Sequence, residues 1–312
     1  CNKMQFKYCV IGDVCYQYLR GDETENSPEQ VKIRKSENII PVKKYDMHKS
    51  MSVPGSVPKI QNTTYPGYVI SSRTDPNCQL KLDSSKDVIE NFWYALALCH
   101  SCSVQTINGE EEYICVSPDS VELVKAAKAQ GFSLSYSGSD KVRTIKLGQN
   151  KNQTKNIELL ELIEFSSDRK RESVIIRDGN LIKLYCKGAD SIIAERLSKN
   201  IPPQIKDRCV HYVNKFSEQG FRTLFIAMKV LSQQEYLAFS QALKQAKLSE
   251  DKDAEVEKVS ETVENELYLL GATIVEDKLQ DKVPETINDL HLAGIKIWML
   301  TGDKMNTAYN IA

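Results

Sequence analysis

Strand-type alternation and helical periodicity take turns along most of this chain, and this order constrains its fold more than any other feature. Strand patterns occupy residues 112–116, 157–165, 174–177, 181–186 and 223–228. Asp178-Gly179-Asn180, between the third and the fourth of these, is a typical hairpin turn. Helical patterns occupy residues 86–103, 117–130, 190–199, 204–219 and 232–247. The order predicts an α/β protein with a mixed sheet.

The C-terminal residues follow a different pattern. Residues 269–275 and 295–300 are apolar runs of the buried-strand type, and residues 283–293 between them form an amphipathic helical pattern. Strand, helix and strand, followed by the polar turn Thr301-Gly302-Asp303, is typical of half a doubly wound parallel sheet, whose ligands bind at the carboxyl ends of the strands. A hydroxyl, a glycine N–H and a carboxylate suit a phosphoryl group there. The structural alternative is that Gly302 permits the turn and Asp303 caps a helix.

Composition excludes several classes of protein. Lys plus Arg is 41 and Asp plus Glu is 42, for a net charge of −1, which argues against a general nucleic-acid binder. The longest unbroken apolar run, Phe92 to Cys99, is far short of the ~20 residues that a membrane helix needs. No secretory signal precedes the first strand, and because the chain does not begin with Met we expect a fragment.

The nine cysteines are scattered, which favours a reducing environment. Cys99 and Cys102 have the spacing of a metal or redox motif, but no second Cys/His pair lies at zinc-finger distance. We therefore expect Cys99 to line the core and no metal to bind. Residues 21–87 are rich in Ser, Pro, Lys and Asn and are expected to be loop-rich, and the charged stretch 250–266 is expected to be a solvated helix.

Three sites suggest nucleotide chemistry. Phe165 ends a strand pattern and is followed by the cations 169–171, so a ring could stack on a purine while cations neutralise phosphate oxygens. Lys187, in Lys-Gly-Ala-Asp, places an ammonium where the backbone can approach a ligand closely. Arg222 could offer a planar guanidinium to phosphate. The structural alternatives are a core Phe, a strand-to-helix turn and a surface ion pair of little energetic value.

Together these pieces resemble the cytosolic part of the phospholipid-flippase branch of the P-type ATPases, over nearly the whole chain. The matching segments are Asn2-Lys3-Met4-Gln5-Phe6, Ser117-Pro118-Asp119, Glu164 to Arg171, Lys187 to Asp190, Phe221 to Leu224, Glu276-Asp277-Lys278-Leu279-Gln280, and Gly294 to Lys304 with Thr307-Ala308.

The resemblance implies an α+β nucleotide-binding domain with a mainly antiparallel sheet, attached to part of a haloacid dehalogenase-like, doubly wound phosphorylation domain. Residues 1–20 would begin the phosphorylation domain, residues 21–268 would form the nucleotide-binding domain, and residues 269–312 would be a further part of the phosphorylation domain. The whole enzyme would be an integral membrane protein, with this segment on the cytosolic face, and an accessory membrane subunit would be among its partners.

The resemblance also implies a reaction. Such pumps use ATP and Mg²⁺ to phosphorylate the Asp of an Asp-Lys-Thr-Gly-Thr motif, and hydrolyse that aspartyl phosphate while phospholipid crosses the membrane. The nucleophile motif would precede Cys1, and the Gly-Asp-Gly-x-Asn-Asp motif that holds Mg²⁺ is absent from the 312 residues. We therefore expect the segment alone to be inactive.

Residue by residue, the resemblance implies that Phe165 stacks on adenine, that Lys187 lines the adenine and ribose site, and that Arg222 reaches the phosphates. Thr301, Gly302 and Asp303 would hold the γ-phosphoryl group during transfer. Asp277 would orient the hinge between the domains.

Two residues depart from the family pattern. Ser120 stands where the family usually has a Glu that approaches the adenine amino group, and we expect nucleotide binding to be weakened by ~1 kcal/mol. Glu172 replaces an apolar residue and adds a negative charge near the phosphates. One alternative is a non-catalytic interaction module, in which Ser120 marks a decayed nucleotide site. Another is a soluble haloacid dehalogenase-like phosphatase, which would need an Asp-x-Asp pair at a strand end that the sequence lacks.

Overall fold

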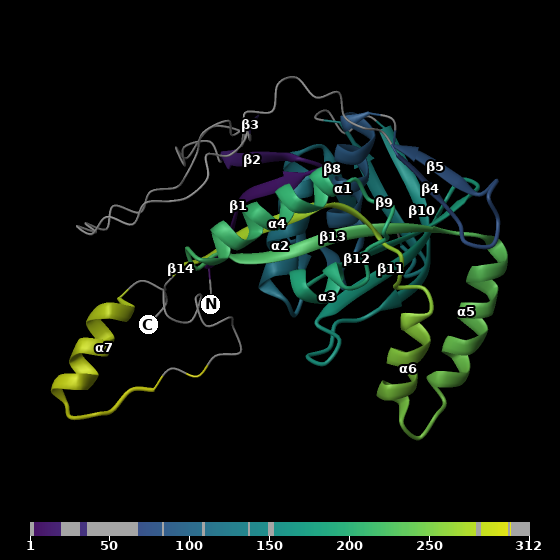
Figure 1. Ribbon diagram of the computed structural model, residues 1–312. Coiled ribbons are helices and arrows are strands. Elements are labelled where there is room, and N and C mark those ends of the chain that lie inside the picture. The colour runs from purple at the N-terminus through teal and green to yellow at the C-terminus, as the bar shows by residue number, and fades with distance from the viewer. Residues whose placement is uncertain are drawn as a thin grey trace.

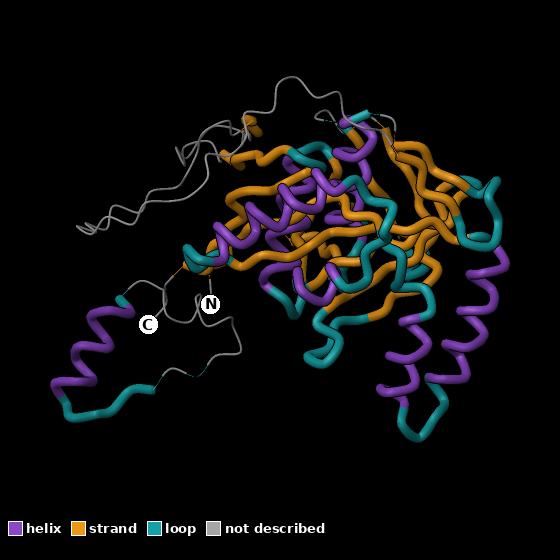
Figure 2. Tube along the Cα trace, viewed as in Figure 1, coloured by secondary structure: helices purple, strands orange, loops and turns teal. Residues whose placement is uncertain are grey.

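A ten-stranded sheet, in which every neighbouring pair of strands is antiparallel, organises the computed structural model (Figures 1 and 2). The structure describes residues 3–19, 32–35, 68–82, 84–107, 110–136, 138–148, 153–278, 282–298 and 300. The sheet order is β3-β2-β1-β14-β13-β12-β11-β10-β9-β8, and two hairpins, β4-β5 and β6-β7, lie outside it. The α/β class and the mainly antiparallel sheet that the resemblance implies are therefore confirmed. The mixed sheet predicted from the order of the patterns is wrong for the described strands, because each ladder of the large sheet is antiparallel.

The strands of the large sheet and of the two hairpins have the following bounds. They are β1 Lys3–Ile11, β2 Val14–Leu19, β3 Lys32–Lys35, β4 Tyr68–Ser71, β5 Gln79–Leu82, β6 Ser103–Ile107, β7 Glu110–Ile114, β8 Phe132–Ser135, β9 Val142–Leu147, β10 Gln153–Ile163, β11 Arg171–Asp178, β12 Leu181–Gly188, β13 Arg222–Leu231 and β14 Tyr268–Lys278.

The helices are α1 Ser85–Leu98, α2 Pro118–Ala129, α3 Asp190–Ala194, α4 Pro203–Ser217, α5 Gln233–Ala246, α6 Lys252–Glu261 and α7 Val283–Leu292. Helix α2 packs on α1, β8 and β1, whereas α4 packs on β13 and β14. In Figure 1, α4 crosses in front of the sheet and α1 and α2 lie behind it. None of the described side chains of α7 is buried.

The helix starts follow local capping chemistry. Ser84 and Asp87 form a capping box at α1, and Ser232 and Glu235 form another at α5. Ser117 caps α2, and Pro118 lies at the first helical position, within the predicted helical pattern 117–130. These local signals explain why the observed helices begin within a residue or so of the predicted patterns.

The core lies on both faces of the central strands. Residues 182–188 of β12 and 225–231 of β13 are buried in succession, without the alternation of a sheet that has one solvated face. Cys99 is among the buried core residues, which confirms its predicted place. Helices must therefore cover both faces, and polar side chains in these strands need partners inside the protein.

The structure corrects two expectations near the C-terminus. Residues 269–275 belong to β14, which pairs antiparallel with both β1 and β13 rather than starting a parallel sheet. Residues 295–298 form no strand and are exposed, because no neighbouring strand among the described residues pairs with them. The attachment of a doubly wound domain, and the division at residues 20 and 268, remain predictions. Of the loop-rich residues 21–87, only those of 32–35, 68–82 and 84–87 are described.

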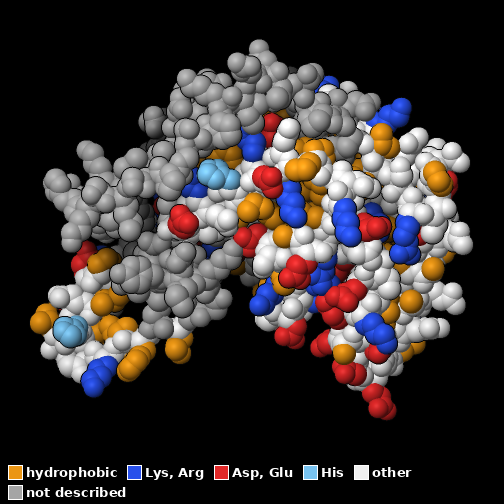
Figure 3. Space-filling view, viewed as in Figure 1, with side chains coloured by type: hydrophobic (Ala, Val, Ile, Leu, Met, Phe, Trp, Pro, Cys, Tyr) orange, Lys and Arg blue, Asp and Glu red, His pale blue; other side chains and the backbone are white. Residues whose placement is uncertain are grey.

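The stretch 250–266 is only partly solvated. Exposed acidic side chains, including Glu250, Asp251 and Asp253, lie at the tip of the α5–α6 pair, where Figure 3 shows red side chains at the lower right. Ser260 and Glu264, by contrast, are fully buried. The expectation of a solvated helix throughout is therefore wrong at its C-terminal end, because Glu264 meets buried arginines.

Asp178, the last residue of β11, forms ion pairs with the neighbouring strands β10 and β12. Its carboxylate lies 2.7 Å from Lys155 Nζ and 2.8 Å from Lys183 Nζ. Burial alone would raise the pKa of Asp178, but the two ammonium groups outweigh burial and hold the pKa below its ordinary value. The ion pairs of Asp178 therefore stabilise the fold fully when the pH is above the pKa that Asp178 has in the unfolded chain. This stabilisation is lost as the pH falls through the lower pKa that Asp178 has in the folded chain.

We predict that Asp178→Asn lowers the free energy of unfolding by about 1–3 kcal/mol at pH 7. The difference from the unchanged chain should shrink below about pH 4, where the carboxylate is protonated in the unfolded chain. Urea denaturation at several pH values would measure it. Asp207→Asn, at an exposed position of α4, is the control, and an equal, pH-independent loss in both variants would contradict the prediction.

Candidate nucleotide-binding site

The predicted binding residues that the structure describes lie at one end of the sheet. Because the strands are antiparallel, the carboxyl ends of β10 and β12 lie beside the amino ends of β11 and β13. Phe165 follows β10, Lys187 lies near the end of β12, and Arg222 begins β13. The sheet thus brings together residues that are distant in the sequence. Thr301, Gly302 and Asp303 lie outside the described residues.

Phe165 is exposed, with 61% of its surface accessible. It belongs to the turn between β10 and β11, where the Arg169 N–H donates to Ser166 Oγ at 3.1 Å. The structural alternative of a core Phe does not apply. An exposed ring costs hydrophobic free energy, and its face is available to stack on a planar ligand.

Gly188, at the end of β12, lets the β10–β11 turn pack closely against that strand. The Ala189 N–H donates to the Lys170 carbonyl at 3.0 Å. A Cβ at Gly188 would lie 2.6 Å from the Cβ of Arg171 and 2.7 Å from the Lys170 oxygen. Only glycine permits this approach, which explains the Gly of the Lys-Gly-Ala-Asp segment.

Lys187 is buried and has two polar partners. Its Nζ donates to Ser120 Oγ at 2.9 Å and lies 3.1 Å from Glu172 Oε2. Glu172 stands directly opposite Lys187 in the β11–β12 register. Glu172, which is expected to add a negative charge near the phosphates, thus neutralises the buried ammonium of Lys187.

Arg222 lies between two carboxylates. Its Nη1 is 3.2 Å from Asp119 Oδ2 and its Nη2 is 2.8 Å from Asp277 Oδ2, with a third of the side chain exposed. Burial raises the pKa of Asp119 above its ordinary value, against the opposing attraction of Arg222. One cation and two carboxylates leave this group negative when all are ionised, so a phosphate that binds Arg222 must compete with Asp119 or Asp277.

The first turn of α2 connects the two cations. Asp119, which pairs with Arg222, and Ser120, which accepts from Lys187, are consecutive residues in that turn. Ser117 Oγ accepts from the Ser120 N–H at 3.3 Å and so fixes the turn. Lys187 and Arg222 therefore converge on one helical turn, although their contacts leave the nucleotide roles of all these residues as predictions.

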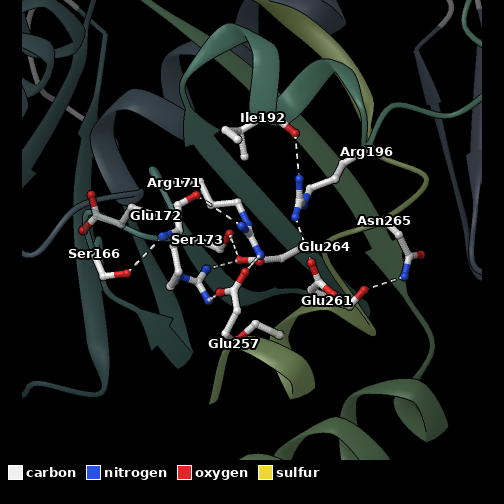
Figure 4. Close-up of polar contacts among 12 residues, drawn as sticks. Ser166, Arg171, Glu172, Ser173, Ile192, Arg196, Glu257, Glu261, Glu264 and Asn265 are labelled. Atoms are coloured by element: carbon white, nitrogen blue, oxygen red, sulfur yellow. Dashed lines mark hydrogen bonds and ion pairs between the residues drawn. The ribbon is translucent and has the colours of Figure 1, made fainter. Parts of the chain in front are cut away.

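Arg169 and Arg171, which the sequence predicts to neutralise phosphate oxygens, form ion pairs with two carboxylates of the protein. Arg171 Nε donates to Glu264 Oε2 at 2.7 Å and Arg169 Nη2 donates to Glu264 Oε1 at 2.6 Å, while both arginines also contact Glu257 (Figure 4). The Ser173 hydroxyl donates to the same carboxylate at 2.5 Å. The expectation that these two cations neutralise phosphate is wrong, because the buried Glu264 and the partly buried Glu257 already pair with them. Lys170 is exposed.

Glu257 and Glu264 were missed by sequence reasoning. They lie in a stretch rich in charged residues, where a solvated surface is the ordinary interpretation. The only local signal is the apolar spacing of Val256, Val259 and Val263, which marks one face of α6 and the following turn as facing the protein.

We predict that Glu264→Gln lowers the free energy of unfolding by about 3–5 kcal/mol, because it leaves buried guanidinium groups without full compensation. Glu257→Gln should cost less, since the Glu257 side chain is 31% exposed. Glu255→Gln, on the exposed side of α6 beside Lys258, is the control and should change stability by under about 0.5 kcal/mol. Chemical denaturation measures all three, and equal values for Glu264 and Glu255 would contradict the prediction.

His100 and the cysteines beside it show no ligand geometry of their own. His100 is fully buried, its Nε2 lies 2.8 Å from the Ala97 carbonyl, and its Nδ1 accepts from the Cys102 N–H at 3.0 Å. Burial holds the pKa of His100 well below its ordinary value, so the ring is neutral. Within the described ranges, no group of three or more His, Cys, Asp or Glu residues is placed to hold a metal ion.

Comparison with known proteins defines the class. Residues 88–282 match the family model for the P-type ATPase, cytoplasmic domain N. This match covers more than half of the chain and includes Phe165, Lys187 and Arg222. The chain therefore belongs to the P-type ATPases, and the resemblance seen in its motifs is confirmed.

Similar proteins from three kingdoms specify the branch. The chain is 38% identical to a phospholipid-transporting ATPase of Schizosaccharomyces pombe, C4F10.16c, over 99% of this chain and 22% of that protein. It is 42% identical to the probable phospholipid-transporting ATPase 12 of Arabidopsis thaliana, over 73% of this chain and 20% of that protein. It is 41% identical to the human phospholipid-transporting ATPase IC, over 72% of this chain and 18% of that protein. The chain thus spans about a fifth of the length of these relatives.

No helix among the described residues has both the length and the apolar character required to cross a bilayer. The relatives are named as transporters of phospholipid.

Proposed function

We propose that this chain is the ATP-binding segment of an enzyme that couples ATP hydrolysis to phospholipid translocation across a membrane. The observation that carries the proposal is the arrangement at one end of the sheet. There, an exposed Phe165 follows β10, at the same end of the sheet as Lys187 on β12 and Arg222 on β13, and both cations reach the first turn of α2.

The residues fit the parts of a nucleotide. Phe165 supplies an aromatic face for adenine, Lys187 and Ser120 supply polar groups for the base and ribose, and Arg222 supplies a guanidinium for phosphate oxygens. Asp119 and Asp277 hold that guanidinium in place before phosphate arrives. This division suits a ligand with one planar end and one anionic end.

Phosphoryl transfer belongs to the complete enzyme. Mg²⁺ would be held by the phosphates of ATP and by groups beyond the described residues, and would neutralise developing charge during transfer. Thr301, Gly302 and Asp303 would contact the γ-phosphoryl group, and an Asp outside these residues would accept it. Phospholipid, a membrane location and an accessory membrane subunit are likewise proposed for the complete protein.

The names of the relatives support the lipid substrate, since each of those cited is a phospholipid-transporting ATPase. Asp277, which pairs with Arg222, lies near the end of β14 and just before the last segment of the chain. A phosphate bound at Arg222 would therefore alter the Arg222–Asp277 ion pair beside the end of β14, which supports the proposed hinge role of Asp277.

We predict that Phe165→Ala weakens binding of ATP to the 312-residue chain about tenfold, because base stacking on an aromatic ring contributes about 1–3 kcal/mol. Equilibrium titration with ATP, followed by calorimetry, measures the dissociation constant.

Tyr136→Ala is the matched control. Tyr136 is also an exposed ring, 70% accessible, but it follows β8 at the edge of the sheet, where the register across β9 leads to Asn156 in the amino-terminal half of β10. Equal affinities of the Phe165 and Tyr136 variants would place the nucleotide elsewhere. Absence of ATP binding to the unchanged chain would contradict the proposal and favour the alternative of an interaction module.

A further inference from the structure

A buried ion pair at the sheet end places a hydrogen-bond donor and an acceptor side by side. Lys187 Nζ lies 3.1 Å from Glu172 Oε2, and the two side chains are only 8% and 6% exposed. They come from opposite positions of β11 and β12, so both point to the same face of the sheet. The pair has no net charge, and this reduces the cost of burying both groups.

Two further contacts fix the pair in position. Ser120 Oγ accepts from Lys187 Nζ at 2.9 Å, so α2 determines where the ammonium points. The Cys99 thiol donates to the main-chain carbonyl of Glu172 at 3.3 Å, which holds β11 against α1. Because an ammonium has three N–H groups and a carboxylate has two oxygens, these contacts leave one N–H and Oε1 to bind a ligand.

Glu172 does not serve the neighbouring arginines. In Figure 4 its carboxylate points away from the cluster formed by Arg171, Ser173, Glu257 and Glu264. Successive side chains of a strand point to opposite faces, so Arg171 and Ser173 meet α6 while Glu172 faces α2. Arg169 and Arg171 are neutralised by Glu257 and Glu264, and Glu172 is therefore the counter-ion of Lys187.

We propose that the Lys187–Glu172 pair determines which purine the site accepts. It would read the edge of the base, with the lysine donating to a ring nitrogen and the carboxylate accepting from an exocyclic amino group. Adenine presents this combination, an acceptor at N1 beside a donor at its 6-amino group. Guanine presents the reverse, a donor at N1 beside an acceptor at O6.

The inference rests on the proposed nucleotide site and adds Glu172 as a specificity-determining residue. With guanine in the same pose, O6 faces the Glu172 carboxylate and N1–H faces the Lys187 ammonium. Two acceptors then lie opposite each other, as do two donors, without hydrogen-bond partners. Sites that hydrogen-bond a substrate group reject analogues that leave buried polar groups unpaired.

The test compares the affinities of ATP and GTP for the 312-residue chain and for Glu172→Gln, by calorimetry. The unchanged chain should prefer ATP by at least about tenfold. Because a Gln amide donates as well as accepts, the variant should lose a large part of the preference for ATP, while the Lys187 N–H that faces guanine N1–H preserves the remainder. The ratio is the readout, since the uncompensated charge of Lys187 attracts the phosphates of both nucleotides equally.

A charge exchange tests the same pair without leaving an unpaired ion. The double variant Glu172→Lys, Lys187→Glu keeps the pair neutral but exchanges donor and acceptor, and should lose or invert the preference for ATP. Glu158→Gln, an exposed position of β10 that pairs with Arg177 toward the other end of the strands, should keep the original ratio.

The outcomes separate the two proposals. Equal binding of ATP and GTP to the unchanged chain, or an ATP-to-GTP ratio that neither Glu172→Gln nor the charge exchange alters, would overturn the specificity role while nucleotide binding stands. Binding of neither nucleotide to the unchanged chain would overturn the proposed function and this inference with it.

Discussion

Buried cations at one end of the sheet must be neutralised, and the structure does this separately on the two faces of β11. On one face, Arg169 and Arg171 share the carboxylates of Glu257 and Glu264. On the other face, Glu172 neutralises Lys187. An isolated buried charge is too costly to persist, so each pairing fixes the position of the segments that carry its members.

These pairings determine what the sheet end offers to a ligand. The arginine cluster anchors α6 and the following turn to the start of β11, so the loop that carries Phe165 is attached to a rigid support. The pairing of Lys187 leaves a polar but neutral group for a base. Arg222, with a third of its side chain exposed, is left as the guanidinium that phosphate can reach. In the proposed function, the two ends of a nucleotide would therefore meet chemically different surroundings.

The relation to phospholipid-transporting ATPases gives this arrangement a context. The chain corresponds to about a fifth of each relative, and the proposed role is to bind the nucleotide whose phosphoryl group is transferred elsewhere in the enzyme. Arg222 and Asp277 join the nucleotide end of the sheet to the last strand, β14. In the proposed enzyme, this contact would link nucleotide binding to the position of the segment after β14, since phosphate and Asp277 would compete for the Arg222 guanidinium.

Some features follow from local sequence alone. These features act over a few residues, and the elements that they predict are present in the structure. They are the Asp178-Gly179-Asn180 turn, the capping residues Ser117 and Ser232, and the apolar periodicity of α1, α4 and α5. The motifs around Phe165, Lys187 and Arg222 were sufficient to recognise the family. Helix α3 ends earlier than its pattern suggests, because Leu197 bridges to Leu267 and the Ser198 N–H donates to the Leu267 carbonyl.

Pairing across the fold was decided only by the tertiary structure. The apolar run of β14 looks the same whether its neighbours are parallel or antiparallel, and only β1 and β13 on either side settle the direction. Glu264 lies more than ninety positions from its arginines, and Ser120 lies far from Lys187, so no local pattern reveals these contacts. Charge by itself indicates solvent exposure, and a carboxylate becomes a buried counter-ion only when folding brings a cation against it. The sequence thus determined the elements and the family, while the register of the strands decided which charges meet.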